Sequence, residues 1–86
     1  MSRRARRDAD PVIATAKGLV GSVEWAYAST GRRGRLLTFD NGSEFWAFGW
    51  RMGLLTDDLV GQQLVLTYER PSPPGGWRFV IEVERA

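Results

Sequence analysis

Hydrophobic and polar residues alternate along most of the chain, and this pattern predicts β-strands. The alternating runs span residues 12–27, 35–40, 43–50, 63–70 and 77–84. A period of two places successive side chains on opposite faces of a sheet. Gly18 and Gly21 lie inside the first run, where glycines are typical of a bend or bulge. The pattern therefore predicts five strands, of which the first is long and bent.

Residues 51–62 interrupt the alternation and predict a helical turn. Thr56 can cap a single turn that carries Asp57 and Asp58 at its positive end. Three strands, a helical turn and two further strands are the order of an OB-type barrel. We therefore predict an all-β fold, a five-stranded antiparallel OB-type small barrel with a short helical turn after the third strand. An SH3-like barrel, which also has five short strands and a helical turn, is the alternative.

Asn41-Gly42 is the strongest hairpin signal in the chain, because both residues tolerate the positive φ of a type I′ turn. A two-residue loop places Leu37 opposite Trp46, and opposed residues share a face of the sheet. One face is then Leu36, Thr38, Phe45 and Ala47, and the other, expected in solvent, is Arg35, Leu37, Phe39, Glu44, Trp46 and Phe48. A three-residue loop that includes Asp40 would reshuffle these faces.

Residues 17–48 carry short motifs that resemble a divergent cold-shock domain. Gly21, Val23 and Trp25 match the family's opening Gly-x-Val-Lys-Trp strand. Residues 31–34 match the two glycines of its middle motif with one extra residue between them, and residues 45–48 fall on its Val-Phe-Val-His-like strand. Residues 59–69 resemble its Leu-x-x-Gly-Gln-x-Val-x-Phe stretch. The resemblance covers roughly residues 17–84.

The resemblance implies binding of single-stranded RNA or DNA by base stacking. Trp25, Trp46 and Phe48 would be stacking positions, although Phe48 replaces the family's His. Arginines stand near the two stacking Phe positions of the middle motif, so contacts there would come from guanidinium groups. Further arginines flank the loop at residues 71–76 and are expected to contact phosphates. The expected nucleic-acid-binding residues are Trp25, Arg32, Arg33, Arg35, Trp46, Phe48, Arg70 and Arg78.

Several of the other large aromatic side chains are expected in the core, because small barrels pack their interiors with rings. Phe45, Tyr68 and Phe79 are the expected core rings, together with at least one tryptophan. Core positions are favoured for Trp50 and Trp77.

The charges fall into two parts, a basic tail and a neutral body. Residues 1–10 carry the whole net charge of +2, and the rest of the chain holds equal numbers of basic and acidic groups. We predict a disordered basic tail at residues 1–11 and a barrel at residues 12–86. Because nucleic-acid binding depends on neutralised phosphates, the neutral body keeps an alternative open. The same aromatic and arginine face would suit a small regulator or inhibitor that docks a partner protein, or self-association as a weak homodimer.

Composition excludes several classes of function. The chain contains no Cys and no His, which rules out disulfides, zinc fingers, thiol nucleophiles and Ser-His-Asp chemistry. The carboxylates are scattered and no phosphate-binding loop motif is present, so we expect no enzyme activity, cofactor or metal site. No run of 18 apolar residues occurs, so no membrane span is expected. A cytoplasmic location is the default expectation.

Overall fold

The computed structural model of the protein describes residues 13–71 and 76–86. The predicted tail at residues 1–11 lies outside this range. So do residues 72–75 of the loop predicted at residues 71–76. The described elements are β1 (Ile13–Tyr27), β2 (Arg33–Phe39), β3 (Glu44–Ala47), the 3-10 helices η1 (Gly49–Leu54) and η2 (Asp57–Leu59), β4 (Gln63–Glu69) and β5 (Phe79–Arg85). Within these residues, the prediction of an all-β fold with five strands is confirmed.

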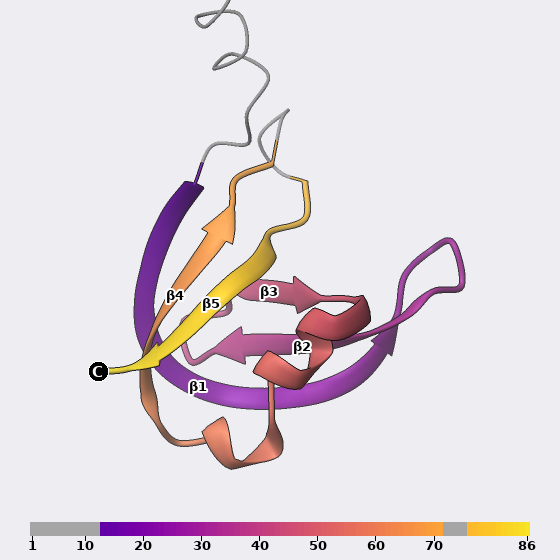
Figure 1. The fold of residues 1–86 in the computed structure, drawn as a ribbon. Helices are drawn as coiled ribbons and strands as arrows, with labels where there is room; N and C mark the ends of the chain where they lie inside the picture. The colour runs from indigo at the N-terminus through magenta and orange to yellow at the C-terminus, as the bar shows by residue number, and fades with distance from the viewer. Residues whose placement is uncertain (1–12, 72–75) are drawn as a thin grey trace, which may run out of the picture.

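The strands form one sheet that closes on itself in the order β1-β2-β3-β5-β4, with β4 paired back onto β1 (Figure 1). The pairing of β3 with β5 is parallel and consists of a single bridge between Trp46 and Phe79, whereas the other pairings are antiparallel. The prediction of an antiparallel barrel is therefore wrong at this seam. The reason is geometric. In a closed ring with an odd number of strands, the strands cannot all alternate in direction, so at least one neighbouring pair must be parallel.

Strand β1 bends at the predicted glycine. Val20 pairs with Phe39 and Ser22 with Thr38, which leaves Gly21 unpaired as a bulge. Residues 13–19 pair with β4 and residues 20–27 with β2, so β1 curves around the sheet in Figure 1. The bulge shifts the alternation by one residue, as bulges do.

The turn between β2 and β3 has three residues rather than two. The Phe39 N–H donates to the Ser43 carbonyl at 2.9 Å, and the Gly42 N–H donates to the Phe39 carbonyl at 2.9 Å. Gly42 has a φ of +92°, which favours glycine. Leu37 consequently lies opposite Phe45 and Leu36 opposite Trp46. The predicted register is wrong by one residue.

This shift inverts the predicted faces of β2 and leaves those of β3 correct. Leu37 and Phe39 are buried, although both were expected in solvent. Leu36, expected on the face of Phe45, instead shares the outward face with Trp46. A period of two makes any one-residue shift exchange the two faces of a strand.

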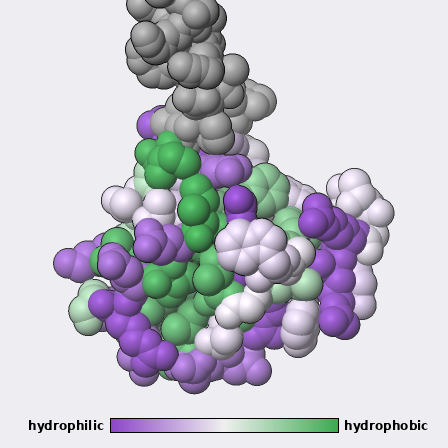
Figure 2. Space-filling model, viewed as in Figure 1, coloured by the Kyte–Doolittle hydropathy of each residue, from purple (hydrophilic) through white to green (hydrophobic). Residues whose placement is uncertain are grey.

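The core is one cluster centred on Phe45, whose ring lies 5.1 Å from that of Phe39 and 5.2 Å from that of Tyr68 between centroids. The expected burial of Phe45 is confirmed, and Tyr68 packs against the cluster. Figure 2 shows hydrophobic side chains gathered at the centre of the face that β5 crosses, with hydrophilic side chains around them. The buried cluster consists of Val20, Leu37, Phe39, Phe45, Ala47, Leu55, Leu59, Leu64, Leu66 and Val80.

Two 3-10 helices follow β3. The predicted turn after Thr56 corresponds to η2, but the Thr56 side chain forms no cap hydrogen bond. The helix η1 was not predicted, since the strand expected up to residue 50 ends at Ala47. Gly49, with a φ of +62°, starts this helix. Buried Leu55 and Leu59 anchor the helical segment to the core.

Replacement of Gly18 by a larger residue is expected to destabilise the fold for a steric reason. A Cβ atom there would lie 2.6 Å from Cδ2 of the buried Phe39 ring. Gly18→Ala should lower the free energy of unfolding by about 1–3 kcal/mol through overpacking, as measured by urea denaturation. Gly53→Ala is the control, because a Cβ at Gly53 meets nothing within 4 Å. Equal stability of the two variants would contradict the packing described above.

Candidate functional site

Four aromatic rings gather outside the core along the seam between β3 and β5. The Trp46 ring lies 5.5 Å from that of Phe48 and 4.8 Å from that of Trp77, at interplanar angles of 5° and 11°. The centroids of Phe48 and Trp77 are 6.1 Å apart, so the three near-parallel rings form a triangular patch rather than a column. Phe79 borders this patch, 5.8 Å from Phe48. We call these four residues the outer aromatic surface.

Local structure explains why these rings point outward. In β3, Phe45 and Ala47 face the core, so Trp46 and then Phe48 face the other side. Gly34 of β2 makes room for the Phe48 ring, because a Cβ there would lie 2.6 Å from Phe48 Cε1. Trp46 and Phe48 therefore point away from the core, as expected, but both side chains are half-buried rather than fully exposed.

Arg32 extends from the β1–β2 loop onto this surface. Its guanidinium carbon lies 4.9 Å from the centroid of the Phe48 ring, within the range of a cation–π contact. The residue is exposed, so its charge remains accessible to an anionic ligand. The structure therefore brings together three of the predicted site residues: Arg32, Trp46 and Phe48.

The Trp25 side chain lies on the opposite face of the sheet from the outer aromatic surface. Trp25 pairs with Arg35, which in turn pairs with Ala47, so this row faces the interior side of the sheet. Trp25 is 53% exposed, and the guanidinium carbons of Arg33 and Arg35 lie 4.3 and 4.4 Å from the centroid of its ring. The alternation of β2 thus separates Arg33 from Arg32. Trp25 and Arg33 form a second surface, and the buried Arg35 packs against the Trp25 ring.

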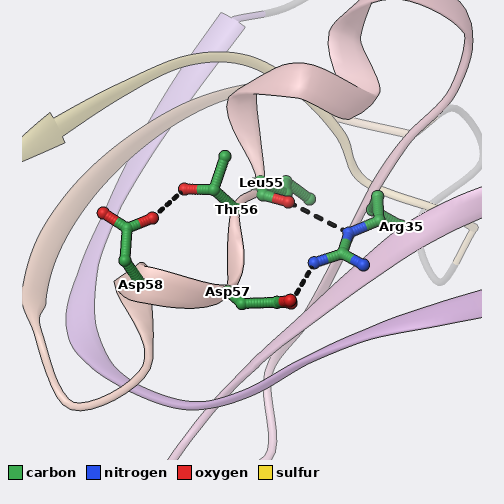
Figure 3. A network of polar contacts seen from close by, with 5 residues as sticks. All are labelled: Arg35, Leu55, Thr56, Asp57 and Asp58. Atoms are coloured by element: carbon green, nitrogen blue, oxygen red, sulfur yellow. Dashed lines mark hydrogen bonds and ion pairs between the residues drawn. The ribbon is translucent and has the colours of Figure 1, made fainter.

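Arg35 is a structural residue rather than an accessible cation. It is only 4% exposed, and its Nε donates to the Leu55 carbonyl at 3.0 Å. Its Nη2 forms an ion pair with Asp57, so the side chain ties β2 to Leu55 and to the first residue of η2 (Figure 3). Because its donors are directed at protein acceptors, we leave Arg35 out of the candidate interface, contrary to the sequence expectation.

The two arginines near the β4–β5 loop differ in their surroundings. Arg78 is half-buried, with its guanidinium carbon 4.7 Å from the centroid of the Phe45 ring. Its carbonyl accepts a hydrogen bond of 2.8 Å from the Trp46 N–H, which helps to join β5 to β3. Arg70 is exposed just after β4. Arg70 therefore stays an accessible candidate, whereas Arg78 contributes to the seam.

Sequence reasoning missed the outward position of Trp77 and Trp50. Both were expected in the core, but they are 39% and 77% exposed. For Trp77 the cause is a bulge in β5: Thr67 pairs with Glu82 and Tyr68 with Val80, so Ile81 is skipped. No glycine marks this bulge in the sequence. As a result Val80 points into the core and the expected core ring Phe79 is only half-buried.

A pocket of about 360 Å³ adjoins the outer aromatic surface. Its aromatic lining is Phe48, Trp50 and Phe79, and its charged lining is Arg32, Arg51 and Glu69. We call it the Phe48 pocket. Arg51 Nη1 lies 3.8 Å from Glu69 Oε2, an ion-pair distance too long for a hydrogen bond. A pocket of the same volume lies beside Trp25, lined in part by Met52, Leu55 and Asp57.

Carboxylates occupy the far end of the outward face. Glu24 lies in one row with Leu36 and Trp46, and Glu44 opens β3 two residues before Trp46. Both carboxylates are exposed. The outward face therefore carries positive charge near Phe48 and negative charge beyond Trp46.

The described part of the chain offers neither a metal site nor a membrane span. Residues 13–71 and 76–86 contain no group of three or more carboxylates that could hold a metal ion. The helices in this part are too short and too polar to cross a membrane.

Comparison of the chain with protein-family models, with curated proteins and with solved structures finds no match.

Arg35 should be needed for stability. Arg35→Met keeps much of the side-chain length but leaves the buried Leu55 carbonyl without its donor, so the free energy of unfolding should fall by about 1–3 kcal/mol. Chemical denaturation measures this loss. Arg33→Met, at an exposed position on the same face of β2, should change stability much less. A difference below the error of the measurement would argue against the structural role of Arg35.

Asp58 should titrate below its ordinary pKa of 3.8, because its carboxylate accepts a hydrogen bond from the Thr56 hydroxyl and pairs with Arg85. The ionised form is favoured in the folded state. Its stabilising contribution is therefore complete above the unfolded-state pKa and is lost as pH falls through the lower folded-state pKa. Thr56→Val should raise the Asp58 pKa, as followed by NMR titration of its carboxyl carbon. An unchanged pKa would show that the hydroxyl is not the main cause.

Proposed function

We propose that this protein is an OB-type barrel that binds single-stranded RNA or DNA on its outer aromatic surface. Bases would stack on Trp46, Phe48 and Trp77, and Arg32 would contact a phosphate. The observation that carries the proposal is the patch of three near-parallel rings outside the core. Stacking on aromatic side chains is how single strands are bound without sequence readout.

The strands and loops that carry these side chains support the proposal. OB barrels bind their ligands on strands 2 and 3 and on the loops that join strands 1–2 and 4–5. Trp46 lies on β3, Arg32 lies in the β1–β2 loop and Trp77 precedes β5. Trp46 and Phe48 are also stacking positions implied by the resemblance to the cold-shock domain.

The charge distribution limits how a strand would run. Exposed Glu24 and Glu44 would repel phosphates beyond Trp46, so the backbone is expected to pass near Arg32. Few accessible cations border the rings, which favours modest affinity with a measurable salt dependence.

A protein ligand is the second candidate function, and the same two carboxylates favour it. On the outward face, Trp46 has the carboxylates of Glu24 and Glu44 on one side and Arg32 on the other. Such a face would suit a protein partner with complementary charges. Tryptophan and arginine are also enriched in interface hot spots.

Trp46→Ala and Trp25→Ala together test the proposed surface. Labelled oligo(U) and oligo(dT) are titrated with the full chain and followed by fluorescence anisotropy. Trp46→Ala should weaken binding about 5- to 150-fold, equivalent to the roughly 1–3 kcal/mol of one stacked base. Trp25→Ala, on the other side of β2, should change affinity much less.

Three further measurements make this comparison decisive. Circular dichroism and urea denaturation check that both variants fold, and wild-type binding should weaken as salt rises from 50 to 200 mM. Equal losses for the two variants would contradict the assignment of the surface. A full chain that binds neither oligonucleotide would overturn the proposal in favour of a protein ligand.

A further inference from the structure

We propose that the Phe48 pocket holds one guanine base of the bound strand and that Glu69 reads it. This inference rests on the proposed function, because the pocket shares Phe48 and Phe79 with the outer aromatic surface. A strand stacked on Trp46 and Phe48 would therefore pass the mouth of the pocket. The proposal adds a sequence preference to binding that stacking alone leaves unspecific.

The size and lining of the pocket suit a flat ring. Its volume of about 360 Å³ lies in the range of small-ligand sites, which combine apolar and aromatic walls with a few polar groups. Phe48, Phe79 and the exposed Trp50 supply the aromatic walls. Glu69 is the carboxylate among the lining residues.

Glu69 has the capacity to accept hydrogen bonds from a ligand. It is the last residue of β4, and its side chain is 31% exposed. Its ion-pair partner Arg51 stands 3.8 Å away, beyond hydrogen-bond distance. An ionised carboxylate is an acceptor only, with two oxygens that can be used side by side. The pocket therefore favours a ligand that presents two adjacent donors.

Guanine is the base that matches this requirement. Its N1–H and its 2-amino group point in parallel from one edge and can donate to both oxygens of one carboxylate. Adenine and cytosine present a single amino group beside a ring acceptor, and uracil presents one N–H between two carbonyls. The geometry of the acceptor thus selects guanine among the four bases.

The charges at the pocket favour a nucleotide over a cation. Aromatic pockets with a carboxylate can bind quaternary ammonium groups. Here Arg32 and Arg51 line the pocket together with Glu69, so its local charge is positive. A base attached to phosphates satisfies both arginines, whereas a quaternary ammonium ion would be repelled.

The test compares three labelled oligo(U) heptanucleotides that differ only in the central base. This base is guanine, hypoxanthine or uracil. The full-length chain should bind the guanine strand about tenfold or more tightly than the uracil strand, since a good bidentate contact discriminates by at least that factor. Hypoxanthine lacks the 2-amino group and should bind with intermediate affinity.

Glu69→Gln should bring the three affinities together, because it removes the carboxylate that distinguishes the three bases. Glu82→Gln is the matched control, since Glu82 is an exposed carboxylate of β5 that does not line the pocket. This variant should keep the guanine preference. Thermal unfolding shows whether Glu69→Gln remains folded; if it does not, Glu69→Asp, which withdraws the carboxylate by one methylene, should reduce the preference.

The outcomes separate the two proposals. Equal wild-type affinity for the three strands overturns the guanine inference and leaves single-strand binding in place. A guanine preference that persists in folded Glu69→Gln overturns the role of Glu69. Binding of none of the strands overturns both proposals. Saturable quenching of tryptophan fluorescence by tetramethylammonium, without any guanine preference, assigns the pocket to cations instead.

Discussion

The three-residue turn between β2 and β3 is the constraint on which the surfaces of this protein depend. It sets the pairing of Leu37 with Phe45 and of Leu36 with Trp46. With this register, hydrophobic residues of β2 complete the core behind Phe45, and Gly34 lies where the Phe48 ring needs space. A turn shorter by one residue would direct the other half of the β2 side chains inward, because the side-chain period of a strand is two.

The same register divides the arginines of β2 and its preceding loop between different tasks. Arg35 is directed inward, where it satisfies the Leu55 carbonyl and pairs with Asp57. Arg32 reaches the opposite face and lies over the Phe48 ring. Basic residues that are clustered in the sequence therefore do not form a single electrostatic patch when they lie in a strand, because successive side chains point to opposite faces. One arginine stabilises the packing of the helical segment, and another keeps an accessible charge beside the rings.

The seam between β3 and β5 links folding to the candidate function. An odd number of strands forces one parallel contact, and this contact has a single bridge between Trp46 and Phe79. Such a short pairing provides few backbone hydrogen bonds, so ring contacts, including the close approach of Trp46 and Trp77, add to the cohesion of the seam. The rings that join the two strands are also the ones that form the outer aromatic surface. This dual role gives a physical reason for a small domain to carry large, partly exposed side chains.

Local sequence was sufficient to determine that strands form and where β1 bends. It also determined that Trp46 and Phe48 face the side of the sheet opposite to Phe45. Alternation and glycine positions act over a few residues, which is why local sequence sufficed. It did not determine which face of β2 is buried, that Arg35 is enclosed, or that Trp77 joins the outer aromatic surface. These features depend on one-residue offsets: the longer turn after Phe39 and the bulge in β5 opposite Thr67 and Tyr68. Pairing with distant strands and packing of the shared core decide such offsets, and only the tertiary structure contains those contacts.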